Sequence, residues 1–393
     1  MTSPQQGSTI LEPEQMRVVN QIPVQTRSER PTSTNPDDFA PVHGRELEWR
    51  LTPVAALRPL FDSALDGSRY EITTETPPGV AVSWVASADA ERGVAGLPED
   101  RLTALAWSQT KEVLVIDISG EQGEPIRLTR EALGEHPRAA HTLIRVAPQT
   151  HATLVMESRG PATLAETVEC VVEEGSSLEW VSVHDWSDNA VQWASHFAHL
   201  GRDASLTNTV VNLEGSVVVV NPSVVLAGTG SSATMLGAYF AESHQHQEHR
   251  VFVHHEGPQT TSEVTYKGAL HGKGARTVWI GDVLIGGEAV GTDSYEQNRN
   301  LVLSEGTRAD SIPNLEIKTG DIRGAGHASA TGRFDDAQLF YLLSRGIPEG
   351  DARRLIVQGF LGDVLQRISV ERLRAELLEK VTTKLDHTQG EEQ

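Results

Sequence analysis

Short apolar runs rich in valine and isoleucine recur along about two hundred residues of this chain, with turn residues between them. They are 113-VLVIDIS, 142-TLIRV, 167-TVECVV, 178-LEWVSV, 217-VVVVNPSVVL, 251-VFV, 278-VWIGDVLI and 301-LVL. Runs of this length and composition are typical of β-strands. Between about Leu102 and Ile317 they therefore indicate a parallel β-helix or a large sandwich.

A parallel β-helix is the favoured fold class for this region. A doubly wound sheet would need long amphipathic crossover helices, and the sequence between the runs has none. Alternation in 167-TVECVV places Val168, Cys170 and Val172 on one face, which we expect to point inward. In 178-LEWVSV the apolar residues are split between both faces, so its inward face is less well defined.

The segments on either side of the β-rich region differ from it in composition. The first is rich in Ser, Thr, Pro, Gln and charge, which predicts a flexible tail. In the next, Pro53 and Pro59 interrupt an apolar pattern and predict short broken helices. The predicted parts are a flexible tail (1–38), an N-terminal mixed or helical region (39–101), a β-helix core (102–332) and a C-terminal helical domain with a short tail (333–393).

After Gly332 the apolar period becomes that of a helix. Asp335 is a candidate N-cap, and Gly346 with Pro348 predicts where the first helix ends. A second helix is expected from about Glu349 and a third over 373–385. Three short helices cannot bury so wide an apolar stripe alone, so we expect docking to the β region or to another protein. The candidate partner contacts are Leu339, Phe340, Leu355 and Phe360.

Charge and composition argue against two classes of main partner. The chain has 393 residues with 54 acidic and 33 basic side chains, a formal net charge of -21. This balance argues against nucleic acid or an anionic membrane as the main partner. The N-terminus lacks a basic segment followed by an apolar run, and no uncharged apolar stretch is long enough to span a bilayer. We therefore expect a cytoplasmic protein.

Cys170 is the single cysteine of the chain. One cysteine allows no internal disulfide, no CxxC zinc site and no cluster held by four cysteines of this chain. Its valine neighbours on the same predicted face favour a buried structural thiol over a reactive one. Any iron–sulfur chemistry would need further ligands from elsewhere.

His327 lies in the segment 313-PNLEIKTGDIRGAGHASATGRF, among glycine, alanine and serine, just before the change of period. Small neighbours let a partner surface approach closely, so the imidazole is a candidate for an exposed, functional position. The alternative is an ordinary loop histidine.

Three other groups of residues suggest chemistry. The segment 244-HQHQEHRVFVHH has residue types that bind transition metals, although its spacing fits no zinc motif, and a solvated strand face is the alternative. The loop 267-KGALHGKGART lacks P-loop spacing, which argues against nucleotide hydrolysis. Asp282, Glu288, Asp293 and Glu296 resemble the carboxylates of a polysaccharide-cleaving β-helix, although solvated surface residues explain them as well.

Several ordered motifs resemble the SufB/SufD family of iron–sulfur cluster assembly scaffolds, and together they span most of the chain after the tail. The segment 44-GRELEWRLTP is similar to the N-terminal signature of the SufD branch. The other motifs, in chain order, are 266-YKGAL, 292-TDSYEQNRNLVLS, 313-PNLEI and 334-FDDAQLFYLLSRGIP.

The resemblance implies a right-handed parallel β-helix between helical end regions, acting as a non-catalytic subunit. It implies pairing with a SufB-like paralogue and binding of a SufC-like ABC-type ATPase through the C-terminal helices. The cofactor would be an iron–sulfur cluster, transient and shared with the partner subunit, with sulfur supplied by a desulfurase system. A β-helix carbohydrate-active enzyme is the alternative function, and a self-sufficient metal protein using 244–255 is a third.

Within that family a Cys-x-His pair lies at the end of the β-helix, and its histidine is implicated as a cluster ligand at the subunit interface. Counting back from Gly332 places His327 on that histidine and Ala325 on the cysteine. Because alanine can neither ligate iron nor carry sulfur, a metal role here depends on His327 with thiolates from the partner. His255 also falls where the family often has histidine, and it is a weaker candidate ligand.

Overall fold

The computed structural model describes residues 30–131, 133–333 and 336–390. The chain divides into two units, 1–31 and 32–393, and the β-strands and helices described here belong to the second. Most of the predicted tail, residues 1–29, lies outside the described residues. Its last part is ordered, since Pro36–Asp38 form a 3₁₀ turn, η2, whose Asp37 backbone N–H donates to the Asn35 side chain.

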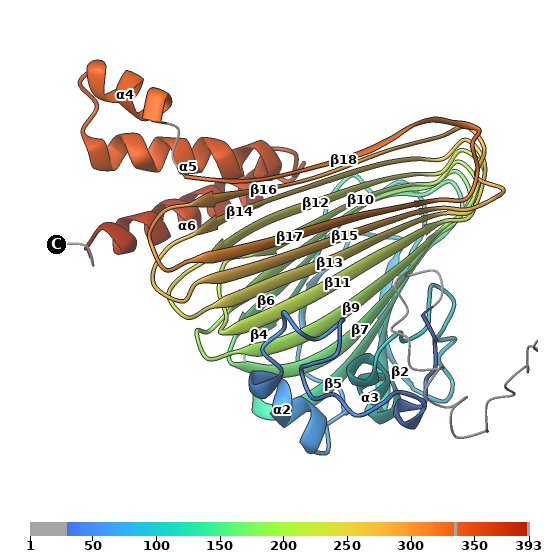
Figure 1. Cartoon of the computed structure of the whole chain (residues 1–393). Helices are drawn as coiled ribbons and strands as arrows, with labels where there is room; N and C mark the ends of the chain where they lie inside the picture. The colour runs from blue at the N-terminus through green and yellow to red at the C-terminus, as the bar shows by residue number, and fades with distance from the viewer. Residues whose placement is uncertain (1–29, 132, 334–335, 391–393) are drawn as a thin grey trace, which may run out of the picture. The chain divides into compact units, whose positions relative to one another are not determined.

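From β3 to β18 the strands alternate along the chain between two sheets, which form a parallel solenoid of about eight turns (Figure 1). Sheet A contains β2 (Val80–Ala86), β3 (Glu112–Ile118), β5 (Gly134–Val146), β7 (Ala162–Val172), β9 (Val191–Leu200), β11 (Val217–Leu226), β13 (His246–His255), β15 (Arg276–Ile285) and β17 (Arg308–Ile317). Sheet B contains β1 (Thr73–Glu75), β4 (Ile126–Glu131), β6 (His151–Gly160), β8 (Ser177–Trp186), β10 (Ser205–Asn212), β12 (Ser232–Ala241), β14 (Thr261–Leu270), β16 (Thr292–Val302) and β18 (Ile322–Gly332). The predicted mainly β fold, a parallel β-helix, is confirmed.

The turns of the solenoid differ in length, which explains why the sequence has no regular repeat. The register partners Leu178, Leu206, Ala233, Ser262 and Ser294 follow one another at intervals of 27 to 32 residues. Turns of unequal length keep the strands in register by varying the loops between them.

Alternate side chains of each strand point into the solenoid. Val168, Cys170 and Val172 all lie in its apolar interior, so the predicted inward face of β7 is confirmed. In β8, Leu178 and Trp180 join the same interior, while Val181 and Val183 face outward into a second apolar cluster. The split apolar pattern of β8 therefore arises because a helix covers the outer face of this strand.

The outer face of sheet A is covered by α2 (Val54–Asp62) and α3 (Arg101–Gln109). The Asp100 carboxylate caps α3 by accepting from the backbone N–H groups of Leu102 and Thr103. Pro59 lies inside α2 and does not end it, which differs from the broken helices expected there. Leu57 and Leu60 on either side of it are fully buried, and this packing outweighs the hydrogen bond that the proline removes.

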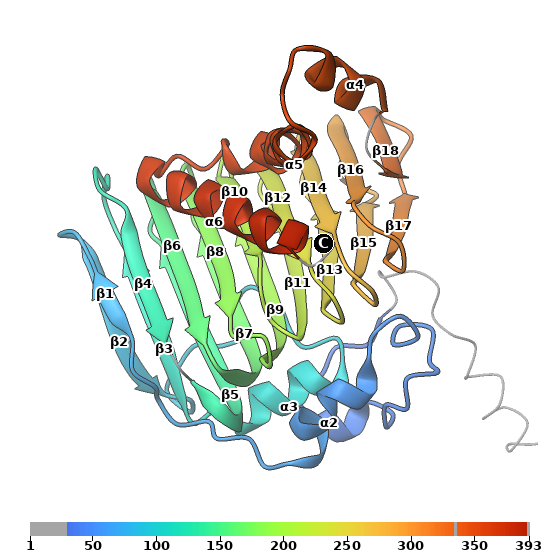
Figure 2. The ribbon, with the colours of Figure 1, turned by 90° about the vertical axis from the view of Figure 1, so that its left-hand side faces the viewer.

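The C-terminal helices are α4 (Asp336–Ser344), α5 (Glu349–Leu365) and α6 (Glu371–Gly390). Gly346 has φ 82 and Pro348 precedes α5, so the predicted break between the first two helices is confirmed. The Asp335 cap lies outside the described residues. Figure 2 shows α6 lying across the strands of sheet B, with α5 beside it and α4 beyond α5.

An apolar cluster fixes α5 and α6 to sheet B. Leu361, Val364 and Leu377 belong to it together with Val183 of β8 and Phe240 of β12. Ion pairs surround the cluster, including Arg367 to Glu263 at 2.7 Å and Lys384 to Glu214 at 2.7 Å. The expected docking of the amphipathic helices on the β region is therefore observed. No helix in the described part of the chain combines the length and apolar character needed to cross a bilayer.

Candidate functional site

The last turn of the solenoid leaves two strands with a single neighbour each. Sheet A ends at β17, which pairs with β15, and sheet B ends at β18, which pairs with β16. Within the described residues no other strand pairs with either of them. Their residues are half-buried or exposed, whereas those of the central strands are mostly buried. Such edges present unpaired backbone groups that can accept a further strand.

His327 lies on β18, in register with Glu296 of β16. Two residues earlier, Ala325 is in register with Ser294 and packs against the interior apolar cluster. Because side chains alternate, His327 shares the inward-facing side of β18 with Ala325. His327 is nevertheless exposed, because no further turn covers this end in the described chain. The imidazole is therefore presented at the open end of the solenoid.

Glu296 lies one strand below His327 and is only 1% exposed. Both of its carboxylate oxygens are buried and have no hydrogen-bond partner. Gly281 of β15 leaves room for the carboxylate, since a methyl group there would overlap it. Burial, and secondarily the charge of Asp282, raises the pKa of Glu296 to about 8. A buried carboxyl without a partner is costly and marks the position for a functional explanation.

A polar network continues from this end into the solenoid. Asn298 donates to the Tyr239 hydroxyl at 2.8 Å, and that hydroxyl donates to Asn300 at 2.8 Å. Asn300 also donates to Ser311 of β17 at 3.2 Å and to Thr331 of β18 at 3.5 Å. These bonds tie both terminal strands to the turn beneath them, so the open end is held in place although its edges are unpaired.

Glu296 and the asparagines were not predicted from the sequence as part of this site. The signal that could have found them is a polar alternation: every second residue of 292-TDSYEQNRN, from Thr292 to Asn300, is polar and buried. A search for apolar runs detected only the end of this strand, 301-LVL. Polar residues repeated at every second position of a solenoid strand predict a hydrophilic interior.

His255, the weaker candidate ligand, lies inside the solenoid. Its Nδ1 is 2.7 Å from the Thr260 hydroxyl and its Nε2 is 2.9 Å from the Ser262 hydroxyl. Burial, and secondarily neighbouring His254, lowers the pKa of His255 to about 4. Both ring nitrogens are thus engaged by hydroxyls, so a metal ion would have to displace one of them. His255 stays a prediction, and its geometry favours a structural role.

The histidines of 244–255 do not converge. His246 faces outward and lies 2.8 Å from Glu248, whereas His249 faces inward and its Nε2 accepts from the Asn212 amide nitrogen at 3.0 Å. The carboxylate of Glu248 also pairs with Arg250 at 2.6 Å. Among the residues that the structure describes, no three His, Cys, Asp or Glu side chains form a group able to hold a metal ion. This segment therefore gives no support to a self-sufficient metal site.

The four candidate carboxylates do not form a hydrolytic pair either. Asp282 accepts from Asn314 at 2.8 Å on the outer face, while Glu288 and Asp293 are exposed. Glu296 alone is turned into the solenoid. Two carboxyl groups opposed across a substrate are what glycoside hydrolysis requires, and this arrangement does not supply them.

The helical end carries an exposed apolar surface, which we call the helical groove. Phe340 is 72% exposed, Tyr341 57% and Leu355 48%. A groove of about 480 Å³ lies between α4 and α5, lined by Ala337, Gln338, Tyr341, Leu342, Leu355 and Ile356. Of the other predicted contacts, Leu339 is half-buried and Phe360 lies under Lys267, whose Nζ is 5.0 Å from the ring.

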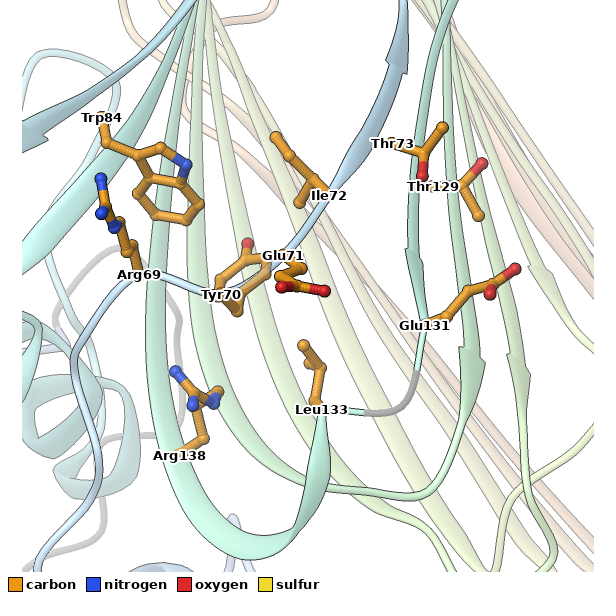
Figure 3. Close-up of a pocket in the computed structure, with 10 residues that line it drawn as sticks. All are labelled: Arg69, Tyr70, Glu71, Ile72, Thr73, Trp84, Thr129, Glu131, Leu133 and Arg138. Atoms are coloured by element: carbon orange, nitrogen blue, oxygen red, sulfur yellow. The ribbon is translucent and has the colours of Figure 1, made fainter.

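A cleft of about 830 Å³ lies at the opposite end of the solenoid, between the segment 69–73 and strand β4 (Figure 3). Arg69, Tyr70 and Trp84 line it together with Glu71 and Glu131. Acidic and basic groups are balanced there, and Arg138, which also lines it, is already paired with Asp66 at 2.8 Å. The cleft therefore lacks the excess positive charge of an anion site.

Comparison with known proteins relates most of the chain to one family. The family model described as "SUF system FeS cluster assembly, SufBD core domain" matches residues 129–360. Iron-sulfur cluster assembly SufBD family protein Rv1462 of Mycobacterium tuberculosis is 44% identical over 366 residues, covering 91% of this chain and 92% of that protein. The Mycobacterium leprae protein of the same description, ML0594, is 43% identical over 364 residues, covering 90% and 93%. A second Mycobacterium tuberculosis member, Rv1461, is 27% identical over 204 residues, covering 52% of this chain and 24% of that protein.

Proposed function

This chain belongs to the SufBD family of iron–sulfur cluster assembly proteins, and we propose that it is a non-catalytic scaffold subunit of a SufBCD-type complex. The resemblance seen in the motifs is thereby confirmed at the level of the family. The SufD branch, the complex and its partners form the proposal, and the expected cytoplasmic location stays a prediction. The observation that carries the proposal is the open last turn of the solenoid, which presents His327 between two unpaired strand edges.

The proposed partner at this end is a SufB-like paralogue. Strands β17 and β18 can each add a strand from a second solenoid, which would continue both sheets across the interface. Two members of the family from one organism, Rv1462 and Rv1461, resemble this chain to different extents, which supports pairing between unlike paralogues. Glycine and alanine on the outward side of β18 allow the close approach that such pairing needs.

The proposed second partner is a SufC-like ABC-type ATPase, bound at the helical groove. Phe340, Tyr341 and Leu355 expose apolar surface there, whereas other apolar residues of α5 and α6 are buried against sheet B. Exposed aromatic and leucine side chains beside a groove are typical of a helix-docking surface. Since this chain lacks P-loop spacing, ATP hydrolysis would belong to that partner.

In this proposal the iron–sulfur cluster is cargo that the complex builds and releases. His327 is the candidate ligand from this chain, and Ala325 supplies no thiol beside it. The only cysteine, Cys170, is fully buried among apolar residues, and burial raises the pKa of its thiol to about 12. It is therefore an unsuitable sulfur carrier, so thiolates have to come from the SufB-like partner and sulfur from a desulfurase system.

The experiment is co-expression of the chain with a SufB-like paralogue and a SufC-like ATPase, followed by anaerobic reconstitution with iron and sulfide. We expect the three proteins to co-purify, and His327→Ala to lower cluster yield without dissociating them, because a ligand and not a packing residue is lost. His136→Ala, an exposed histidine at the other end, is the matched control. Failure to co-purify would contradict the scaffold role, and an unchanged cluster yield would remove His327 from it.

A further inference from the structure

Glu296 is a buried carboxyl group near the open end for which the described residues supply no hydrogen-bond partner. Its side chain is 1% exposed, and neither carboxylate oxygen has a hydrogen-bond partner. Elsewhere in the interior, comparable charges are compensated: Glu166 receives two hydrogen bonds of 2.7 Å from Arg130. Taking a carboxylate out of water without a partner costs several kcal/mol, on the order of the cost of breaking a buried pair. An unpaired carboxyl at this place therefore needs a ligand to satisfy it.

The position of Glu296 narrows the class of ligand. It is in register with His327 on the neighbouring parallel strand, and both side chains are on the inward side. In-register neighbours on adjacent strands have backbones about 4.8 Å apart, so a carboxylate oxygen and an imidazole nitrogen can reach one common atom. A carboxylate beside an imidazole suits a divalent transition-metal ion, which accepts both oxygen and nitrogen ligands.

The surroundings favour an ion over an organic ligand. A methyl group at Gly281 of β15 would overlap both the Glu296 carboxylate and the Trp279 ring, so these groups leave little free space on that side. Above it, Ala325 and the small residues around His327 leave the end accessible from outside. The space between a buried carboxylate and an exposed imidazole is thus closed on one side and open toward the proposed partner.

We propose that Glu296 and His327 together hold a single divalent transition-metal ion, of the Fe²⁺ class, at the open end of the solenoid. Two protein ligands leave the other coordination positions to water or to side chains of a partner, so binding by this chain alone is weak and exchangeable. This metal site rests on the proposed function, because in a cluster assembly scaffold an ion bound here would be the iron that enters the cluster.

To test this, the purified, metal-free chain is titrated with Co²⁺ alone. Binding is measured by calorimetry and by the visible absorption of the bound ion. We expect one Co²⁺ per chain, with affinity lowered about tenfold or more in Glu296→Gln and in His327→Ala. The double variant should bind Co²⁺ nearly as tightly as the single variant with the lower affinity, because both side chains bind the same ion. Glu288→Gln and His136→Ala, which alter an exposed carboxylate and an exposed histidine, should bind as the wild type does.

Circular dichroism of each variant checks folding, and His327→Ala, at an exposed position, is the second variant if Glu296→Gln unfolds. The proposal is overturned if the wild type binds no Co²⁺, or if folded Glu296→Gln or folded His327→Ala binds it as tightly as the wild type. Co-purification and cluster yield of the same variants separate the two ideas. If the complex builds clusters but the chain has no Co²⁺ site, only the proposed Glu296–His327 metal site is wrong. If the chain binds Co²⁺ but recruits no partner, the scaffold function is contradicted.

Discussion

The two ends of the solenoid are built in opposite ways. At the first end, β1 and β2 run antiparallel to their neighbours and stop the parallel stack. Large side chains lie over it, with the rings of Tyr70 and Trp84 at 4.9 Å in an edge contact. At the last end, β17 and β18 are parallel to their neighbours and carry small residues such as Ala325. Solenoids need a cap at each end to avoid open pairing, and the uncapped last turn is the surface that we propose for the partner.

The two ends also differ in whether a buried carboxylate is paired. Near the first end, Arg130 holds Glu166 in a two-bonded pair and also lies 5.5 Å from the Trp186 ring. Near the last end, Glu296 is buried without a hydrogen-bond partner. Buried charge at the first end is thus compensated within this chain, whereas in our proposal the last end is completed by a partner. The predictions below test that difference.

The largest expected effect is loss of stability when the pair near the first end is broken. Arg130→Met removes the guanidinium and leaves Glu166 buried and uncompensated, so we expect the free energy of unfolding to fall by about 3–5 kcal/mol. Urea denaturation measures it. Arg202→Met is the control, because its ion pair with Glu174 is on the surface and its loss should leave the midpoint unchanged. Equal midpoints for both variants would contradict the assignment.

A smaller effect is that the two ends respond to pH with opposite signs. Burial alone would raise the pKa of Glu166, but the Arg130 charge lowers it to about 2, so its stabilisation is complete above the unfolded value of 4.5 and is lost as pH falls toward 2. Glu296 has its pKa raised to about 8 by burial and by Asp282, so it destabilises the fold progressively as pH rises from 4.5 to 8.

Glu296→Gln in the metal-free chain should therefore gain stability relative to the wild type across pH 5 to 8, at up to about 1.4 kcal/mol per pH unit. Glu166→Gln should show a flatter acid limb below pH 4.5. Denaturation midpoints measured across this range in the presence of a chelator test both. A parallel pH response of the two variants would show that Glu296 is not held as an uncompensated carboxyl.

The smallest expected change in stability is for a variant that should lose strand pairing with the proposed partner. Ala328→Lys with Ala330→Lys places two charges on the exposed outward side of β18, where lysine on an edge strand prevents strand addition. We expect unfolding to change by no more than about 0.5 kcal/mol, with loss of binding to the SufB-like paralogue in a pull-down.

The matched control is Thr74→Lys with Thr76→Lys, at exposed positions on and just after β1 of the first end. That variant should bind the paralogue as the wild type does. If the β18 variant keeps its partner, or if the β1 variant loses it, the interface is not at the open end.

The interior of the solenoid was predictable where apolar residues alternate. The period of two in β7 identified Val168, Cys170 and Val172, because the inward face of that strand is uniformly apolar. The strands β16, β17 and β18 were harder to predict, since many of their inward residues are polar or small and do not form an apolar alternation. The variable turn length, 26 to 32 residues, hid the repeat for a similar reason, because the loops absorb the difference.

The candidate site was predictable only in part. The family motif pointed to His327, but its relation to Glu296 depends on the register between β16 and β18, which a single sequence does not contain. The carboxylate was considered instead with Asp282, which is close in sequence but lies on the outer face. Spatial partners in a solenoid are one turn apart, so proximity along the chain is a poor guide to them.

Hydrogen–deuterium exchange of β17 and β18, with and without the SufB-like paralogue, tests the open end most directly. Unpaired edge strands exchange quickly, and strands that gain a neighbour are protected. We predict slower exchange across residues 308–332 in the mixture, with no change at β1 and β2. Unchanged exchange across 308–332 in a mixture that co-purifies would contradict the account, because the partner would then be bound elsewhere.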